Sequence, residues 1–193
     1  MPTQQLSPIV RGWLAFAAVG TGLIHLALVI GAPVPLAVLF GVLGFVEFAW
    51  GVLTFVREPF APRVAIVVAV VPVVAWGVLI TLAASGGMPE LAASIALVPL
   101  AVATLFELFI VAVLGSHVRR AADPAGREDG ASRTPGTTKY LIGISAGALV
   151  VASLTSPALA ATEAGQGAVP HGGTVVEQPF ELELPEHGTD GQH

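Results

Sequence analysis

Three ionisable residues lie inside stretches that are otherwise apolar: His25 in LIHLALVI, Glu47 in FGVLGFVEFAWGVL and Glu107 in LAVATLFELFIVAVL. An imidazole in contact with carboxylates can relay protons, and the same three groups suit a divalent metal ion. They can also hydrogen-bond to one another and hold helices together. The chemistry open to these residues, called here the polar trio, depends on whether their side chains meet.

The composition places the polar trio in a membrane. The chain has 193 residues, of which 54% are hydrophobic and 11% are charged, whereas soluble domains carry roughly 25% charged residues. So few charges could not cover the surface of a soluble fold, and the class is integral membrane protein. Cysteine is absent, which excludes disulfides, thiolate metal sites and a cysteine nucleophile.

Five apolar stretches are long enough to cross a bilayer, because a helical span needs about 20 apolar residues. We expect these spans at residues 12–30, 34–56, 64–84, 91–114 and 140–161. Short turns rich in Gly and Pro separate the first four spans, which favours antiparallel neighbouring helices. The predicted fold class is therefore all-α, a membrane bundle of five transmembrane helices.

The positive charges predict how the chain is threaded. Arg11 precedes the first span, and Arg57 and Arg63 flank the loop after the second. The other five basic residues lie between the fourth and fifth spans: Arg119, Arg120, Arg127, Arg133 and Lys139. With five spans all eight fall on one side, which the positive-inside rule assigns to the cytoplasm. We predict a plasma-membrane protein with its N-terminus inside and its C-terminus outside.

The chain divides into a membrane part and two polar segments. We expect a four-helix membrane bundle at 1–118, a flexible cytoplasmic linker at 119–138, a fifth transmembrane helix at 139–161 and an acidic extracytoplasmic tail at 162–193. The fifth span also has the features of a signal peptide. Small residues at Ala158 and Ala160 would allow signal peptidase to cut after Ala160, and an uncleaved span is the alternative.

The members of the polar trio lie at similar depths. Counted from the basic residue at the cytoplasmic end of each span, His25, Glu47 and Glu107 are about 21, 15 and 18 Å deep. Small residues beside them, such as Gly22 and Gly44, let helices approach closely. We therefore predict that His25 points into the bundle and lies near Glu47, Glu107 or both.

Three further residues are expected to support the polar trio. Thr21 precedes His25 by four residues and could hydrogen-bond with it, while Trp50 and Trp76 are expected to line the same interior. Three interpretations of the trio stay open: a packing device, a proton or cation pathway, and a buried metal site. The sequence has no HExxH or paired ExxH signature for the metal interpretation, so the spacing of its ligands is non-specific.

Two other patterns in the sequence are compatible with chemistry. His171, His187 and His193 lie among carboxylates in the tail and could bind a metal ion, the alternative being a solvated acidic tail. GISAG at 143–147 fits the GxSxG nucleophile elbow, but it lies near the start of a membrane span, where GxxxG helix packing is the better interpretation. The sequence offers no phosphate loop, dinucleotide fingerprint or nucleic-acid-binding patch. We therefore do not expect an enzyme.

Residues 10–118 resemble a group of small, uncharacterised multi-spanning membrane proteins common in actinobacteria. The resemblance rests on GTGLIHLALV, FGVLGFVEFAWGVL, VVAWGVLITL and LAVATLFELFIVAVL. Members often carry an acidic residue and a second histidine soon after the first, and the VIGAPVP segment here has neither. The resemblance implies the architecture and no specific activity.

The functional prediction is a small accessory or structural multi-pass protein. The alternative is a proton-coupled or divalent-metal transporter, or a metal-handling membrane protein, that uses the polar trio. The expected partners are the lipid bilayer and either another membrane protein or a second copy of the chain, without nucleic acid. We expect no cofactor other than, in the alternative, a divalent metal ion.

Overall fold

In a computed structural model of the whole chain, the residues described are 6–57, 61–86, 96–122 and 136–168. All regular structure in these residues is helical. The helices are α1 (Pro8–Ala27), α2 (Val34–Val56), α3 (Pro62–Ser85), α5 (Leu97–Ala122), α6 (Thr137–Ala160) and the short α7 (Glu163–Gln166). Each of the five long helices has the length and apolar composition to cross a membrane. The predicted all-α class with five spans is confirmed.

The helix bounds differ from the predicted ones at several ends. Helix α1 begins at Pro8 because the Ser7 side chain caps it, accepting a hydrogen bond of 3.3 Å from the backbone N–H of Val10, and Pro is favoured at a first helical position. Helix α5 continues to Ala122, into the segment expected to be a linker. Its last turn carries Arg119 and Arg120, whose charges interact favourably with the helix C-terminus.

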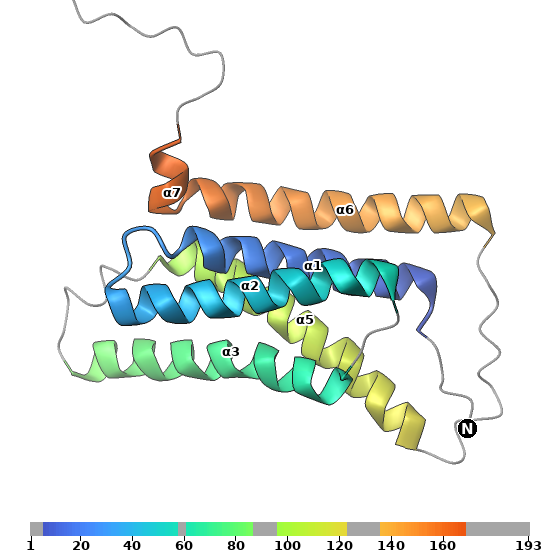
Figure 1. Cartoon of the computed structure of the whole chain (residues 1–193), viewed down its shortest axis with the longest axis horizontal. Helices are drawn as coiled ribbons and strands as arrows, with labels where there is room; N and C mark the ends of the chain where they lie inside the picture. The colour runs from blue at the N-terminus through green and yellow to red at the C-terminus, as the bar shows by residue number, and fades with distance from the viewer. Residues whose placement is uncertain (1–5, 58–60, 87–95, 123–135, 169–193) are drawn as a thin grey trace, which may run out of the picture.

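Helix α1 lies at the centre of the bundle. It contacts α2, α5 and α6, whereas α3 packs chiefly on α5. Figure 1 shows α1, α2, α3 and α6 running roughly parallel or antiparallel to one another, with α5 crossing them obliquely. In the apolar stretch of α1 56% of the residues are buried, against 17–39% in the other four long helices. Side chains of α1 are therefore the ones that can meet residues from several helices at once.

Glycines bring α1 and α2 into backbone contact. A Cβ atom on Gly22 would lie 2.7 Å from the carbonyl oxygen of Gly44, and a Cβ on Gly44 would lie 2.8 Å from the carbonyl oxygen of Gly22. Neither position has room for a larger residue, as expected where small residues line a membrane helix interface. This contact lies one turn from both His25 and Glu47, and so holds the two helices together at the polar trio.

Helix α6 is attached to α1 through its GISAG segment. The indole N–H of Trp13 donates a hydrogen bond of 2.9 Å to the carbonyl oxygen of Gly143. A Cβ on Gly147 would lie 2.8 Å from the same indole nitrogen. GISAG therefore lies within a continuous helix and packs against α1 as a GxxxG face, so its geometry is not that of a nucleophile elbow.

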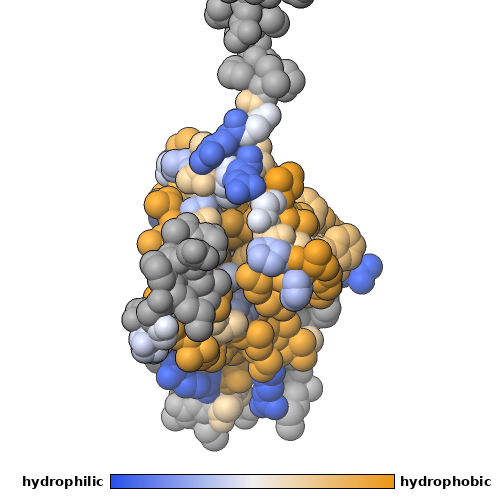
Figure 2. Space-filling model, turned by 90° about the vertical axis from the view of Figure 1, so that its left-hand side faces the viewer, coloured by the Kyte–Doolittle hydropathy of each residue, from blue (hydrophilic) through white to orange (hydrophobic). Residues whose placement is uncertain are grey.

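The outside of the bundle is apolar. Val38, Val42 and Phe45 on α2 are 62%, 58% and 67% exposed. Figure 2 faces the end of the bundle that carries the α1–α2 turn, and hydrophobic residues cover much of its described surface. Such a surface suits lipid rather than water. The polar side chains of the trio are therefore enclosed by helices that are themselves surrounded by apolar surface.

Candidate metal centre inside the bundle

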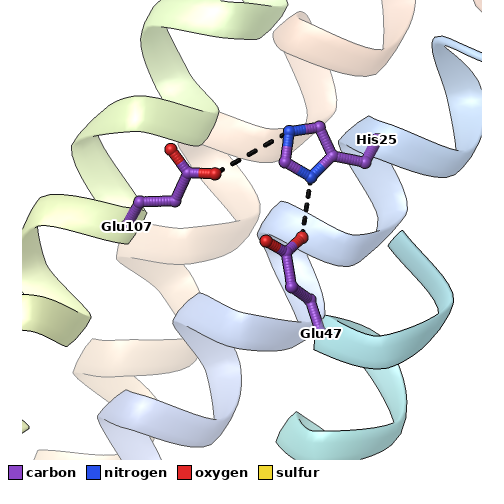
Figure 3. A group of neighbouring side chains, drawn as sticks. All are labelled: His25, Glu47 and Glu107. Atoms are coloured by element: carbon purple, nitrogen blue, oxygen red, sulfur yellow. Dashed lines mark hydrogen bonds and ion pairs between the residues drawn. The ribbon is translucent and has the colours of Figure 1, made fainter. Parts of the chain in front are cut away.

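The polar trio is assembled from three different helices. His25 comes from α1, Glu47 from α2 and Glu107 from α5. The imidazole of His25 lies between the two carboxylates (Figure 3). Its Nδ1 atom is 2.7 Å from Oε2 of Glu47, and its Nε2 atom is 3.8 Å from Oε1 of Glu107. The prediction that His25 points into the bundle near Glu47, Glu107 or both is confirmed, and His25 lies near both.

The trio is buried inside the bundle. His25 is 0% exposed, Glu107 1% and Glu47 7%. The 2.7 Å contact is a hydrogen bond between the imidazole and Glu47, whereas 3.8 Å exceeds hydrogen-bond length. Glu107 thus faces the second ring nitrogen across a gap, without a hydrogen bond to it.

Most of the trio's polar atoms make no hydrogen bond. In the described part of the chain, five buried side-chain atoms lack a partner, and four belong to the trio: His25 Nε2, Glu47 Oε1, and both carboxylate oxygens of Glu107. An unsatisfied polar group in hydrocarbon costs several kcal/mol. A device built only for packing would be expected to pair these atoms. Four potential ligand atoms therefore remain unused inside the bundle.

The donor set suits a divalent metal ion. One ligand atom from each member of the trio can be chosen so that all three lie within 4.8 Å of one another. Imidazole nitrogen with carboxylate oxygen is a donor combination typical of Zn²⁺, Mn²⁺ or Fe²⁺. Bonds of about 2.1 Å in tetrahedral geometry place ligand atoms about 3.4 Å apart. The chosen atoms of the trio lie within 4.8 Å of one another, and because the imidazole lies between the two carboxylates, its ring has to turn before one nitrogen can share an ion with both.

Aromatic rings cover one side of the imidazole. The ring of Phe40 stacks on His25 with centroids 5.8 Å apart, and Trp76 stacks on Phe40 at 5.1 Å. Trp76 is 8% exposed, so its predicted place in the interior is confirmed. Phe40 was missed from the sequence. Its signal was its position seven residues before Glu47, which puts the two side chains on the same face of α2.

Thr21 and Trp50 do not lie at the centre of the polar trio. The Thr21 hydroxyl donates a hydrogen bond of 3.0 Å to the carbonyl oxygen of Ala17. The Nδ1 atom of His25 is bonded to Glu47 and its Nε2 atom has no hydrogen-bond partner, so the predicted hydrogen bond between Thr21 and His25 is not formed. Bonding to the carbonyl four residues back is a common alternative for Thr within a helix. Trp50 lines a cavity of about 290 Å³ between α2 and α3, which also reaches Glu47.

The predicted metal-binding histidines of the tail, His171, His187 and His193, lie outside the described residues. The acidic tail begins with the short helix α7. The hydroxyl of Thr162 caps it, accepting a hydrogen bond of 3.1 Å from the backbone N–H of Gly165.

Comparisons with protein families, curated proteins and solved structures found no match to this chain. The resemblance to small actinobacterial membrane proteins therefore stays a prediction, as does the absence of enzyme activity. The polar trio is the feature on which a functional proposal can rest.

Proposed function

We propose that this chain is a multi-pass membrane protein that binds one divalent metal ion with His25, Glu47 and Glu107 in exchange for protons. The observation that supports this function is the convergence of three donor groups within 4.8 Å, while four of their buried atoms make no hydrogen bond. A metal ion would take up these donor atoms, which contacts among the three side chains leave unused.

Charge balance indicates how many protons are exchanged. A neutral imidazole with two carboxylates carries a charge of −2, and each charge near the bilayer centre costs at least ~2.5–3.5 kcal/mol. A divalent ion cancels that charge. Two protons, one on the imidazole and one on a carboxylate, cancel it equally. Exchange of one ion for two protons thus keeps the site neutral in both states, and metal binding should release those protons.

The test is a metal titration of the purified protein in detergent. The triple substitution H171A/H187A/H193A provides the background, because tail histidines could bind metal by themselves. We expect one Zn²⁺ or Mn²⁺ per chain, with about two protons released as measured by a pH indicator. His25→Ala, Glu47→Gln and Glu107→Gln should each weaken binding by about 100-fold or more, since each removes a ligand charge or donor.

The matched control for the histidine is His117→Ala, because His117 lies near the end of α5, away from the trio. It should bind metal like the background protein. A background protein that binds no metal, or a Glu107→Gln variant that binds it unchanged, would leave the trio as a packing device.

For location we propose the plasma membrane, with the N-terminus in the cytoplasm. The beginnings of α1, α3 and α6 and the ends of α2 and α5 lie at one end of the bundle (Figure 1). The described Arg and Lys residues, from Arg11 to Lys139, lie at or beside these helix ends. The positive-inside rule assigns such an end to the cytoplasm. A reporter fused after His193 should be active only outside the cytoplasm, and activity inside would refute this orientation.

A further inference from the structure

A second cavity approaches the trio from the opposite end of the bundle. It has a volume of about 270 Å³ and lies between the α1–α2 turn, the beginning of α5 and α7. We call it the α7 cavity, and the one between α2 and α3 the α2–α3 cavity. The wall of the α7 cavity includes Phe40 and Trp76, so it ends at the ring that stacks on His25.

The walls of the two cavities differ in polarity. In the α7 cavity the described lining includes Thr162, Glu163 and Gln166. In the α2–α3 cavity, Glu47 is the one ionisable residue among the described residues of the lining, which are otherwise Ala, Val, Leu, Ile, Phe and Trp. A hydrated cation is stabilised by polar groups and excluded from apolar walls. The α7 cavity is thus the better approach for an ion.

The Glu163 side chain lies at this cavity, beside the α1–α2 turn. Gly31 adopts a φ of +83° in that turn, and a Cβ at this position would overlap the Glu163 carboxylate. The carboxylate thus lies directly against the turn, and its side chain is exposed. A negative charge at the mouth of a cavity raises the local concentration of cations.

From these observations we infer that the α7 cavity is the entrance through which a divalent cation reaches the polar trio, and that the ring of Phe40 closes this entrance. The inference rests on the proposed metal binding. Phe40 separates the α7 cavity from the imidazole, so an ion that enters from this cavity can pass only when the ring moves aside. Glu163 attracts the ion before this step and takes no part in final coordination.

The test measures rates of Zn²⁺ binding and of chelator-induced release by stopped flow, in the background without tail histidines. Phe40→Ala and the milder Phe40→Leu should speed both rates, by about tenfold or more for Ala, because a gate affects rates rather than the end states. Phe45→Ala is the matched control, since Phe45 lies on α2 at the α2–α3 cavity. Its rates should equal those of the background.

Two further measurements do not depend on the Phe40 variants folding. Glu163→Gln should slow binding several-fold at low salt and leave it unchanged at high salt. Because the chain has no cysteine, Leu36→Cys in the α7 cavity can be labelled with a bulky maleimide, which should block metal exchange. The same label on Val38→Cys, which is 62% exposed, should leave exchange intact.

The outcomes separate the two proposals. If the background protein binds no Zn²⁺, the proposed function fails. If it binds Zn²⁺ but neither the Phe40 variants nor the labelled Leu36→Cys alters the rates, the metal centre stands and the entrance is refuted. Faster exchange in Phe45→Ala alone would place the entrance at the α2–α3 cavity and overturn the inference in the same way.

Discussion

Helices α1 and α3 make an instructive pair, because the more hydrophobic of the two is the less buried. The apolar stretch of α3 has the higher hydropathy, yet 17% of it is buried, against 56% in α1. In lipid, apolar side chains gain little by turning inward, and helix association depends on close packing and polar contacts instead. Helix α1 has glycines, alanines and His25 on its packed faces, whereas much of α3 presents valine and leucine to the surroundings.

The largest difference between α1 and α3 is expected when His25 is removed from the buried face of α1. His25→Ala should lower the free energy of unfolding by about 3–5 kcal/mol, because it leaves the buried carboxyl group of Glu47 without its hydrogen-bond partner and a hole beside Glu107. The measurement is the melting temperature in detergent without metal. Thr81→Ala on α3 is the comparison: this hydroxyl is exposed and bonds only within its own helix, to the carbonyl oxygen of Gly77. An equal loss in both variants would contradict the central role of α1.

A pair of glycine substitutions tests the packing directly. Gly22→Ala should destabilise the bundle by about 1–3 kcal/mol, since its Cβ would press on the backbone of α2 and force the helices apart. Gly77→Ala on α3 has no atom within 4 Å of the new Cβ. It should be neutral or stabilising by up to about 1 kcal/mol, because Ala favours a helix more than Gly does. Equal melting temperatures would show that the α1–α2 contact is not tight.

The smallest change in stability is expected from Glu47→Gln. The amide can still hydrogen-bond to His25, so the free energy of unfolding should change by less than about 1 kcal/mol. Metal binding by the same variant should nevertheless be about 100-fold weaker or more. A clear drop in melting temperature with metal binding intact would reverse the roles assigned here, and would make Glu47 a packing residue.

The central part of the site was predictable because depth in a membrane follows from position along a helix. His25, Glu47 and Glu107 are ionisable residues in apolar spans, and a rise of about 1.5 Å per residue put them at similar depth. Lipid offers them no partner, so they had to face the interior. The predicted span 34–56 matches α2 at both ends, because Pro33 and Arg57 mark its two boundaries in the sequence.

Sequence by itself therefore determined the class of protein, its five spans, and which polar residues meet inside it. Only the tertiary structure decided that α1 is central, that Phe40 and Trp76 stack over His25, that the Thr21 hydroxyl turns to Ala17, and that Glu163 lies against Gly31. The physical reason is that hydrophobicity and length set where a residue lies along the membrane normal. The order of helices around the bundle depends on which small residues fit together across interfaces, and such fits join residues far apart in the chain.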